Sequence, residues 1–171
     1  KDAWKRFSDD GYKHYEVVYP GFKYNMMDIQ ASIGIHQLKS LKSGDDKRKK
    51  IWDFYDKELK NLPITLPSSK GENIKHALHL YTVLVDLEKS GISRDNFMME
   101  LHKKGIGTGV HYNVVHLQKY YKETYGYKTG DFPNAEYIGS RTVSLPLGAK
   151  LTITDAKRVV NAVKEVLNIK K

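Results

Sequence analysis

The sequence contains no cysteine, which excludes a disulfide framework, a zinc site built on thiolates and a cysteine nucleophile. Proline is scarce, with 5 residues among 171, and glycine contributes 13. Together with 40% hydrophobic residues, this composition excludes collagen-like and disordered chains and is typical of a globular protein. No stretch of the sequence approaches the roughly 20 apolar residues needed to cross a bilayer. We therefore expect a cytoplasmic protein with a packed core.

Acidic residues are the minority among the charged side chains, with 20 Asp and Glu against 29 Lys and Arg, which gives a net charge of +9. Such a balance is compatible with nucleic acid, an acidic surface or an anionic substrate. The densest basic run, Lys47 to Lys50, directly follows Asp45 and Asp46, an order typical of the first turns of a solvated helix. No nucleic-acid recognition motif accompanies the charge, so a nucleic-acid module is the less favoured alternative.

Two helices are predicted at the start of the chain. Apolar residues surround most of the helix predicted over residues 28–41, and such a helix must be buried on most sides. We expect a second subunit or a further domain to supply part of that cover. Ser43 and Gly44 predict a break, followed by a second helix over residues 45–62.

Strands rich in β-branched and aromatic residues then alternate with helices that have recognisable ends. Ser93 predicts a helix N-cap, and Gly105 predicts the C′ residue of the same helix. Pro133 stands at a first helical position, and Thr152 with Asp155 predicts a capping box. The expected strands are residues 78–85, 106–112 and 142–147, and the expected helices follow Ser93, cover residues 117–125, and follow Pro133 and Thr152. This pattern predicts a small α+β unit with a three-stranded sheet.

One group of candidate ligand-binding residues precedes the first helix. Lys23, Tyr24 and Asn25 stand where unpaired N–H groups and the positive end of the helix dipole attract anions. Asn25 is alternatively the N-cap of that helix, and the pattern alone favours this role.

A second group lies around the ends of two expected strands. His76 and His79 flank the start of one strand, whereas His111, Tyr112 and His116 lie at the end of another, where pockets form. Ordinary packing of these amphipathic side chains explains the pattern equally well. No His-Glu-x-x-His pattern or third ligand completes a zinc site, so no metal is expected.

Several segments resemble DegT/StrS-type sugar aminotransferases, and they follow one another in the order of that family. The segments are GFKYNMMDIQASIG at residues 21–34, HALHLY at 76–81, GIGTGVHY at 105–112, HLQKYY at 116–121 and SLPL at 144–147. The resemblance covers nearly the whole chain. It is greatest to the members that aminate 4-keto sugars on nucleotide carriers, such as the enzyme that makes UDP-4-amino-4-deoxy-L-arabinose.

This resemblance implies the fold type I, aspartate-aminotransferase-like architecture, in which a large domain that binds pyridoxal 5′-phosphate (PLP) precedes a small C-terminal domain. It implies that residues 1–62 are a connecting segment with two interface helices and that residues 63–171 are the small α+β domain. The lysine that holds PLP would lie in the large domain, outside this chain. The start at Lys1, without a methionine, also suggests a piece of a longer protein, and we expect the chain alone to be inactive.

The resemblance also implies partners and site residues, although it places no catalytic residue in this chain. The partners are a nucleotide-linked keto sugar, glutamate as amino donor, and a second copy of the protein in a homodimer with composite active sites. The residues toward the PLP phosphate are Lys23, Tyr24 and Asn25, and those toward the sugar substrate are His79, His111, Tyr112 and His116. The alternative is a non-catalytic regulatory or binding domain derived from this family.

Overall fold

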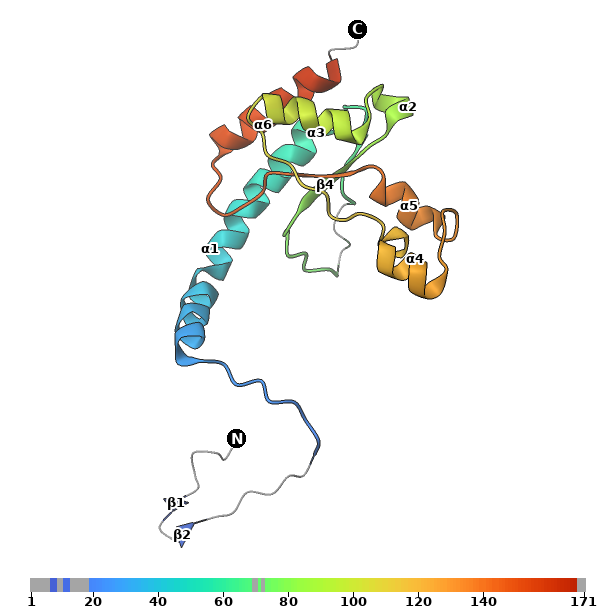
Figure 1. The fold of residues 1–171 in the computed structure, drawn as a ribbon. Coiled ribbons are helices and arrows are strands. Elements are labelled where there is room, and N and C mark those ends of the chain that lie inside the picture. The colour runs from blue at the N-terminus through green and yellow to red at the C-terminus, as the bar shows by residue number, and fades with distance from the viewer. Residues whose placement is uncertain (1–6, 9–10, 13–18, 69–70, 72, 169–171) are drawn as a thin grey trace. The chain divides into compact units, whose positions relative to one another are not determined.

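The computed structural model describes residues 7–8, 11–12, 19–68, 71 and 73–168, and the chain divides into two compact units, residues 1–39 and 40–171 (Figure 1). In the first unit, β1 (Phe7–Ser8) and β2 (Gly11–Tyr12) form an antiparallel pair. Helix α1 (Asp28–Leu59) begins in the first unit and ends in the second.

Helix α1 is continuous, so the predicted break at Ser43 and Gly44 is wrong. A glycine inside a helix costs about 1 kcal/mol relative to alanine, a penalty that packing readily offsets. A Cβ added at Gly44 would lie 3.5 Å from Nη1 of Arg48 and 3.6 Å from Cβ of Ala149, which is ordinary van der Waals contact. The helix therefore tolerates glycine here, at a point where even a larger residue would meet Arg48 and Ala149 without a clash. It ends at Leu59 rather than at residue 62.

The first part of α1 exposes apolar side chains that the sequence predicts to be buried. Ile29 is 73% exposed and Leu38 is 72% exposed. Because the described chain itself leaves them exposed, their cover by a second subunit or a further domain stays a prediction.

The second unit contains a three-stranded antiparallel sheet in the order β3 (Ile64–Thr65), β4 (Tyr81–Val85) and β5 (Thr142–Leu145). The predicted α+β class and the three-stranded sheet are confirmed. Strand β3 has no counterpart among the expected strands, because two residues are too few to show an alternating pattern.

The predicted strand over residues 106–112 is wrong. This segment pairs with the sheet through a single bridge, in which Gly109 stands opposite Ser144 of β5. Gly107 and Gly109 weaken strand pairing, because a glycine loses more backbone entropy than other residues and brings no side chain to pack.

The register of β4 and β5 gives the sheet an apolar face and a more polar face, since successive strand residues point to opposite sides. The apolar face carries Tyr81, Val83, Val143 and Leu145, and the other face carries Thr82, Leu84, Thr142 and Ser144. The apolar face shares one core with the second half of α1, with α3 (Arg94–Lys103) and with α6 (Ile153–Asn168). The rings of Trp52 and Tyr55 lie 4.8 and 5.0 Å from that of Tyr81, which fixes α1 against the sheet.

The predicted caps of the helices that follow Ser93 and Thr152 are confirmed. The Ser93 hydroxyl accepts a hydrogen bond from the Asn96 N–H at the start of α3, and Gly105 follows this helix with a φ of +72°. The Asp155 carboxylate accepts hydrogen bonds from the N–H and the hydroxyl of Thr152 before α6.

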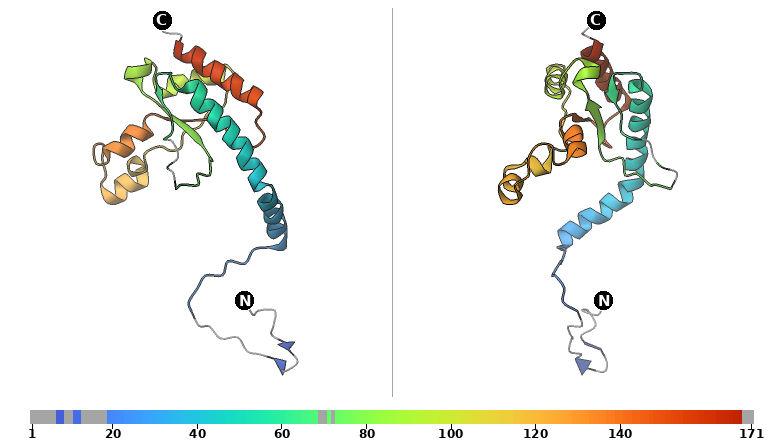
Figure 2. Two further views of the ribbon diagram at one scale, coloured as in Figure 1. Left: turned by 180° about the vertical axis from the view of Figure 1, so that it is seen from behind. Right: turned by 90° about the vertical axis from the view of Figure 1, so that its right-hand side faces the viewer.

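The remaining helical elements are α2 (Leu87–Ser90), η1 (Val115–Leu117), α4 (Lys119–Tyr125) and α5 (Pro133–Gly139), with Pro133 at the first turn as predicted. Figures 1 and 2 show α4 and α5 on the side of β4 away from α6 and the second half of α1. Within the described ranges, no helix is both long and apolar enough to cross a membrane.

Candidate functional site

The stretch before α1 holds the first group of candidate residues. Residues 23–25 are exposed and precede the helix in an irregular conformation. The N-cap position belongs to Met27, because its carbonyl accepts the first helical hydrogen bond, from the Ala31 N–H at 2.9 Å. The Met27 N–H in turn donates to Oε1 of Gln30 at 3.1 Å. The interpretation of Asn25 as the N-cap is therefore wrong.

His111 and Tyr112 lie beside β5, on the more polar face of the sheet. Nδ1 of His111 is 2.7 Å from Oγ of Ser144, and the imidazole and phenol rings of the two neighbours are 4.8 Å apart. Tyr112 is 72% exposed, whereas His111 is half-buried. The imidazole of His111 is thus held in place by Ser144, and the phenol ring of Tyr112 beside it is exposed.

His79 lies just before β4. It is exposed and precedes Tyr81, the first residue of β4. The His111 carbonyl accepts a hydrogen bond from Thr142, which stands opposite Leu84 near the end of β4. The His111 ring leans toward Ser144, which stands opposite Thr82, and among the described residues no hydrogen bond or ring contact joins it to His79.

His116 is buried against α5. Its Nε2 is 3.0 Å from Oε1 of Glu136 in α5, and its ring packs 4.7 Å from that of Phe132. The Gly130 N–H donates to the Glu136 carboxylate, and this bond, opposed by burial and aided by His116, lowers the pKa of Glu136. His116 therefore joins η1 to α5.

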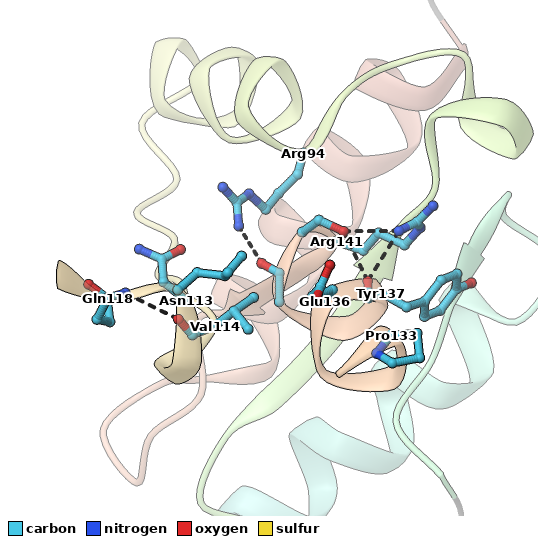
Figure 3. Close-up of a pocket in the computed structure, with 11 residues that line it drawn as sticks. Arg94, Asn113, Val114, Gln118, Pro133, Glu136, Tyr137 and Arg141 are labelled. Atoms are coloured by element: carbon cyan, nitrogen blue, oxygen red, sulfur yellow. Dashed lines mark hydrogen bonds between the residues drawn. The ribbon is translucent and has the colours of Figure 1, made fainter. Parts of the chain in front are cut away.

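A pocket of about 600 Å³ adjoins the segment that follows Tyr112 (Figure 3). Its lining residues are Arg94, Asn113, Val114, Leu117, Gln118, Pro133, Glu136, Tyr137, Gly139, Ser140 and Arg141. A Cβ at Gly139 would lie 2.5 Å from Cγ2 of Val114, so the close approach of α5 to this segment requires glycine. Nη1 of Arg94 donates to the Gly139 carbonyl at 2.7 Å and secures that contact.

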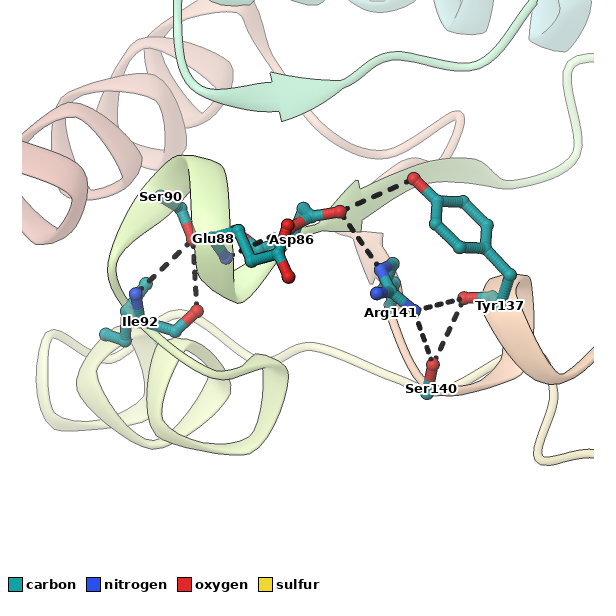
Figure 4. Close-up of polar contacts among 7 residues, drawn as sticks. All are labelled: Asp86, Glu88, Ser90, Ile92, Tyr137, Ser140 and Arg141. Carbon is teal, nitrogen blue, oxygen red and sulfur yellow. Dashed lines mark hydrogen bonds and ion pairs between the residues drawn. The ribbon is translucent and has the colours of Figure 1, made fainter. Parts of the chain in front are cut away.

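A buried carboxylate, which the sequence analysis missed, fixes the wall of this pocket (Figure 4). Asp86 is 7% exposed and accepts hydrogen bonds from Nε of Arg141 at 3.2 Å and from the Glu88 N–H at 3.0 Å. The Arg141 guanidinium stacks over the Tyr137 ring at 4.1 Å. Burial raises the pKa of Asp86, but the bonds from Arg141 and the backbone outweigh it, so the pKa lies below its usual range.

We expect Asp86→Asn to make the fold less sensitive to acid. Because the folded-state pKa of Asp86 is lowered, its ionised form stabilises the fold at neutral pH. That stability is lost as the pH falls through the folded-state pKa. The free energy of unfolding, measured by urea titration, should fall more steeply below about pH 5 in the wild type than in the variant. At pH 7 the variant should be the less stable protein. Parallel pH profiles would contradict this role of Asp86.

The geometry favours binding of a polar ligand over metal chemistry. Among the described residues, no group of three His, Asp or Glu side chains could hold a metal ion. The surface around residues 111–118 instead combines aromatic rings, amides and guanidinium groups, which suit a ligand with several oxygen atoms.

Comparison with known proteins identifies the family. The model of the DegT/DnrJ/EryC1/StrS aminotransferase family matches residues 2–164. The protein MJ1066 of Methanocaldococcus jannaschii is 46% identical over 98% of this chain and 44% of its own length. The spore coat polysaccharide biosynthesis protein SpsC of Bacillus subtilis is 39% identical over 98% of this chain and 43% of its own length.

A solved structure agrees with these sequence matches. The PLP form of Spr1654 from Streptococcus pneumoniae, a putative sugar aminotransferase, superposes with a TM-score of 0.78 at 32% identity, over 90% of this chain and 39% of that one. The chain thus spans less than half the length of the relatives that it matches. Because the family model covers nearly every residue, the chain belongs to the DegT/DnrJ/EryC1/StrS aminotransferase family.

Proposed function

We propose that this chain is the C-terminal part of a PLP-dependent aminotransferase that transfers an amino group from glutamate to a keto sugar on a nucleotide carrier. The observation that carries the proposal is the family match over residues 2–164. The similarity to SpsC supports a role in polysaccharide biosynthesis. In this proposal the enzyme is a cytoplasmic homodimer, residues 1–62 connect its two domains, and residues 63–171 form the small domain.

The residues assigned to PLP do not form a complete cofactor site within this chain. Tyr24 is 86% exposed, and Lys23 and Asn25 are exposed as well, so these side chains do not enclose a ligand. When bound, PLP supplies the electron sink for transamination. We derive no catalytic step from residues 23–25 and assign them, by resemblance, to the PLP phosphate in the partner subunit's site.

The part of this chain in substrate binding is assigned to the surface around residues 111–118. His111, Tyr112 and His116 face the nucleotide-linked sugar in this proposal, with His111 anchored to Ser144 and His116 to Glu136. The net charge of +9 favours a diphosphate-bearing substrate. His79, which is exposed just before β4, is assigned to the substrate by resemblance.

The test is amination by the complete polypeptide. Incubated with PLP, glutamate and a nucleotide-linked 4-keto sugar, it should form one 2-oxoglutarate for each amino sugar, both measured by mass spectrometry. The same keto sugar without its nucleotide is the matched control and should react poorly, because binding energy from the remote nucleotide is then lost. Failure with a panel of nucleotide-linked keto sugars would refute the proposed function.

A further inference from the structure

The contact between His111 and Ser144 joins two segments that are 33 residues apart in the sequence. Ser144 lies in β5 and is 6% exposed, so its hydroxyl is held in place by the sheet. The imidazole ring leans back over Gly109, where an added Cβ would lie 3.0 Å from Cε1 of His111. The hydroxyl and the glycine together fix the orientation of the ring.

The direction of this hydrogen bond follows from the needs of a buried hydroxyl. Among the residues that the structure describes, Nδ1 of His111 is the partner found for the Ser144 hydroxyl. If Nδ1 carried the proton, the Ser144 oxygen would accept it, and the hydroxyl hydrogen would be left buried without an acceptor. Buried polar groups rarely stay unsatisfied, because each costs about 1–3 kcal/mol. The Ser144 hydroxyl therefore donates to Nδ1, and the imidazole proton resides on Nε2.

The two ring nitrogens of an imidazole point in different directions. Because Nδ1 of His111 faces the buried Ser144, Nε2 points away from that hydroxyl, and the ring as a whole is only half-buried. A neutral imidazole with its proton on Nε2 donates a hydrogen bond there and cannot accept one. The matching ligand atom is an oxygen of a hydroxyl, a carbonyl or a phosphate.

We propose that Ser144 is a positioning residue that holds His111 with its proton on Nε2, so that His111 donates a hydrogen bond to an oxygen of the nucleotide-linked sugar. This inference rests on the proposed function, which places the sugar substrate against His111. To that function it adds the donor atom, Nε2 of His111, the kind of acceptor, an oxygen of the sugar substrate, and the residue that orients the imidazole, Ser144.

The first test needs no ligand. Two-dimensional 1H–15N spectra of the imidazole side chains in the 171-residue protein, assigned with a His111→Gln variant, should show the neutral His111 protonated on Nε2. Ser144→Ala should change the 15N shift of Nδ1. Thr142→Val should not, although Thr142 is buried on the same strand and face and donates to the His111 carbonyl. A proton on Nδ1 in the wild type would overturn the proposal, as would an Nδ1 signal that Ser144→Ala leaves unchanged.

The second test measures the complete aminotransferase. Ser144→Ala should raise KM for the nucleotide-linked keto sugar about two- to tenfold, the range of one neutral hydrogen bond, and leave KM for glutamate unchanged. Ser144→Thr keeps the hydroxyl and should restore KM. If the wild type forms no amino sugar, the proposed function fails. If the wild type is active and either Ser144→Ala or His111→Ala keeps its sugar KM, this inference alone is refuted.

Discussion

Supplied with PLP, glutamate and a nucleotide-linked keto sugar, the 171-residue chain alone should form no amino sugar. Under the proposed function, the lysine that holds PLP lies in the large domain, and covalent catalysis by an amine requires that lysine at the cofactor. Two findings support this expectation. The chain spans 44% and 43% of the two curated relatives, and its own residues 23–25 are exposed.

Two measurements check this prediction. When the chain is titrated with PLP, the absorbance spectrum should equal the sum of the spectra of the free chain and free PLP, without the band of covalently bound cofactor. Mass spectrometry should detect no amino sugar beyond the level of a blank without protein. The complete polypeptide at equal concentration is the positive control and should give both signals. Turnover by the chain alone would contradict the proposal that the lysine that holds PLP lies in the large domain, outside this chain.

The sequence predicted those parts of the fold that depend on neighbouring residues. The N-cap Ser93 and the capping box of Thr152 and Asp155 were found because each device is complete within three residues. The continuity of α1 at Gly44 was missed, because Ser43 and Gly44 locally favour a break although the helix continues through them. Helix propensity is a weak guide at a single glycine, and here it gave the wrong result.

The candidate site shows the same division. His111, Tyr112 and His116 were recognised as a group because they follow one another in one segment. Ser144 in β5 is the partner of His111, and Glu136 in α5 is the partner of His116. These pairs are distant in sequence, so no local pattern predicts them. The alternation of Thr142 and Ser144 with apolar neighbours does mark a polar face of the strand, and this signal could have pointed to the side of the sheet that His111 contacts.

Asn25→Ala should weaken PLP binding by the complete enzyme about ten- to hundredfold, the range for one hydrogen bond to a charged group. The free energy of unfolding should change by less than about 0.5 kcal/mol, because Met27 and not Asn25 caps α1, and Asn25 is exposed. Equilibrium dialysis of PLP and urea titration measure the two quantities. Asn61→Ala, another exposed asparagine, is the matched control and should change neither. A loss of stability with unchanged PLP affinity would instead make Asn25 a structural residue.

Mixed dimers decide whether Asn25 serves its own subunit or its neighbour. In a C2 dimer, a residue that reaches across the interface does so twice, once into each site. We would pair a subunit that lacks the PLP lysine with one that carries Asn25→Ala. If Asn25 acts across the interface, the single lysine-bearing site receives an intact Asn25 from the lysine-deficient subunit. Mixing should then restore about one sound site per mixed dimer, measured as amino sugar formed at limiting PLP. If Asn25 served its own subunit, that site would contain the alanine, and each mixed dimer would be no more active per lysine than the Asn25→Ala homodimer.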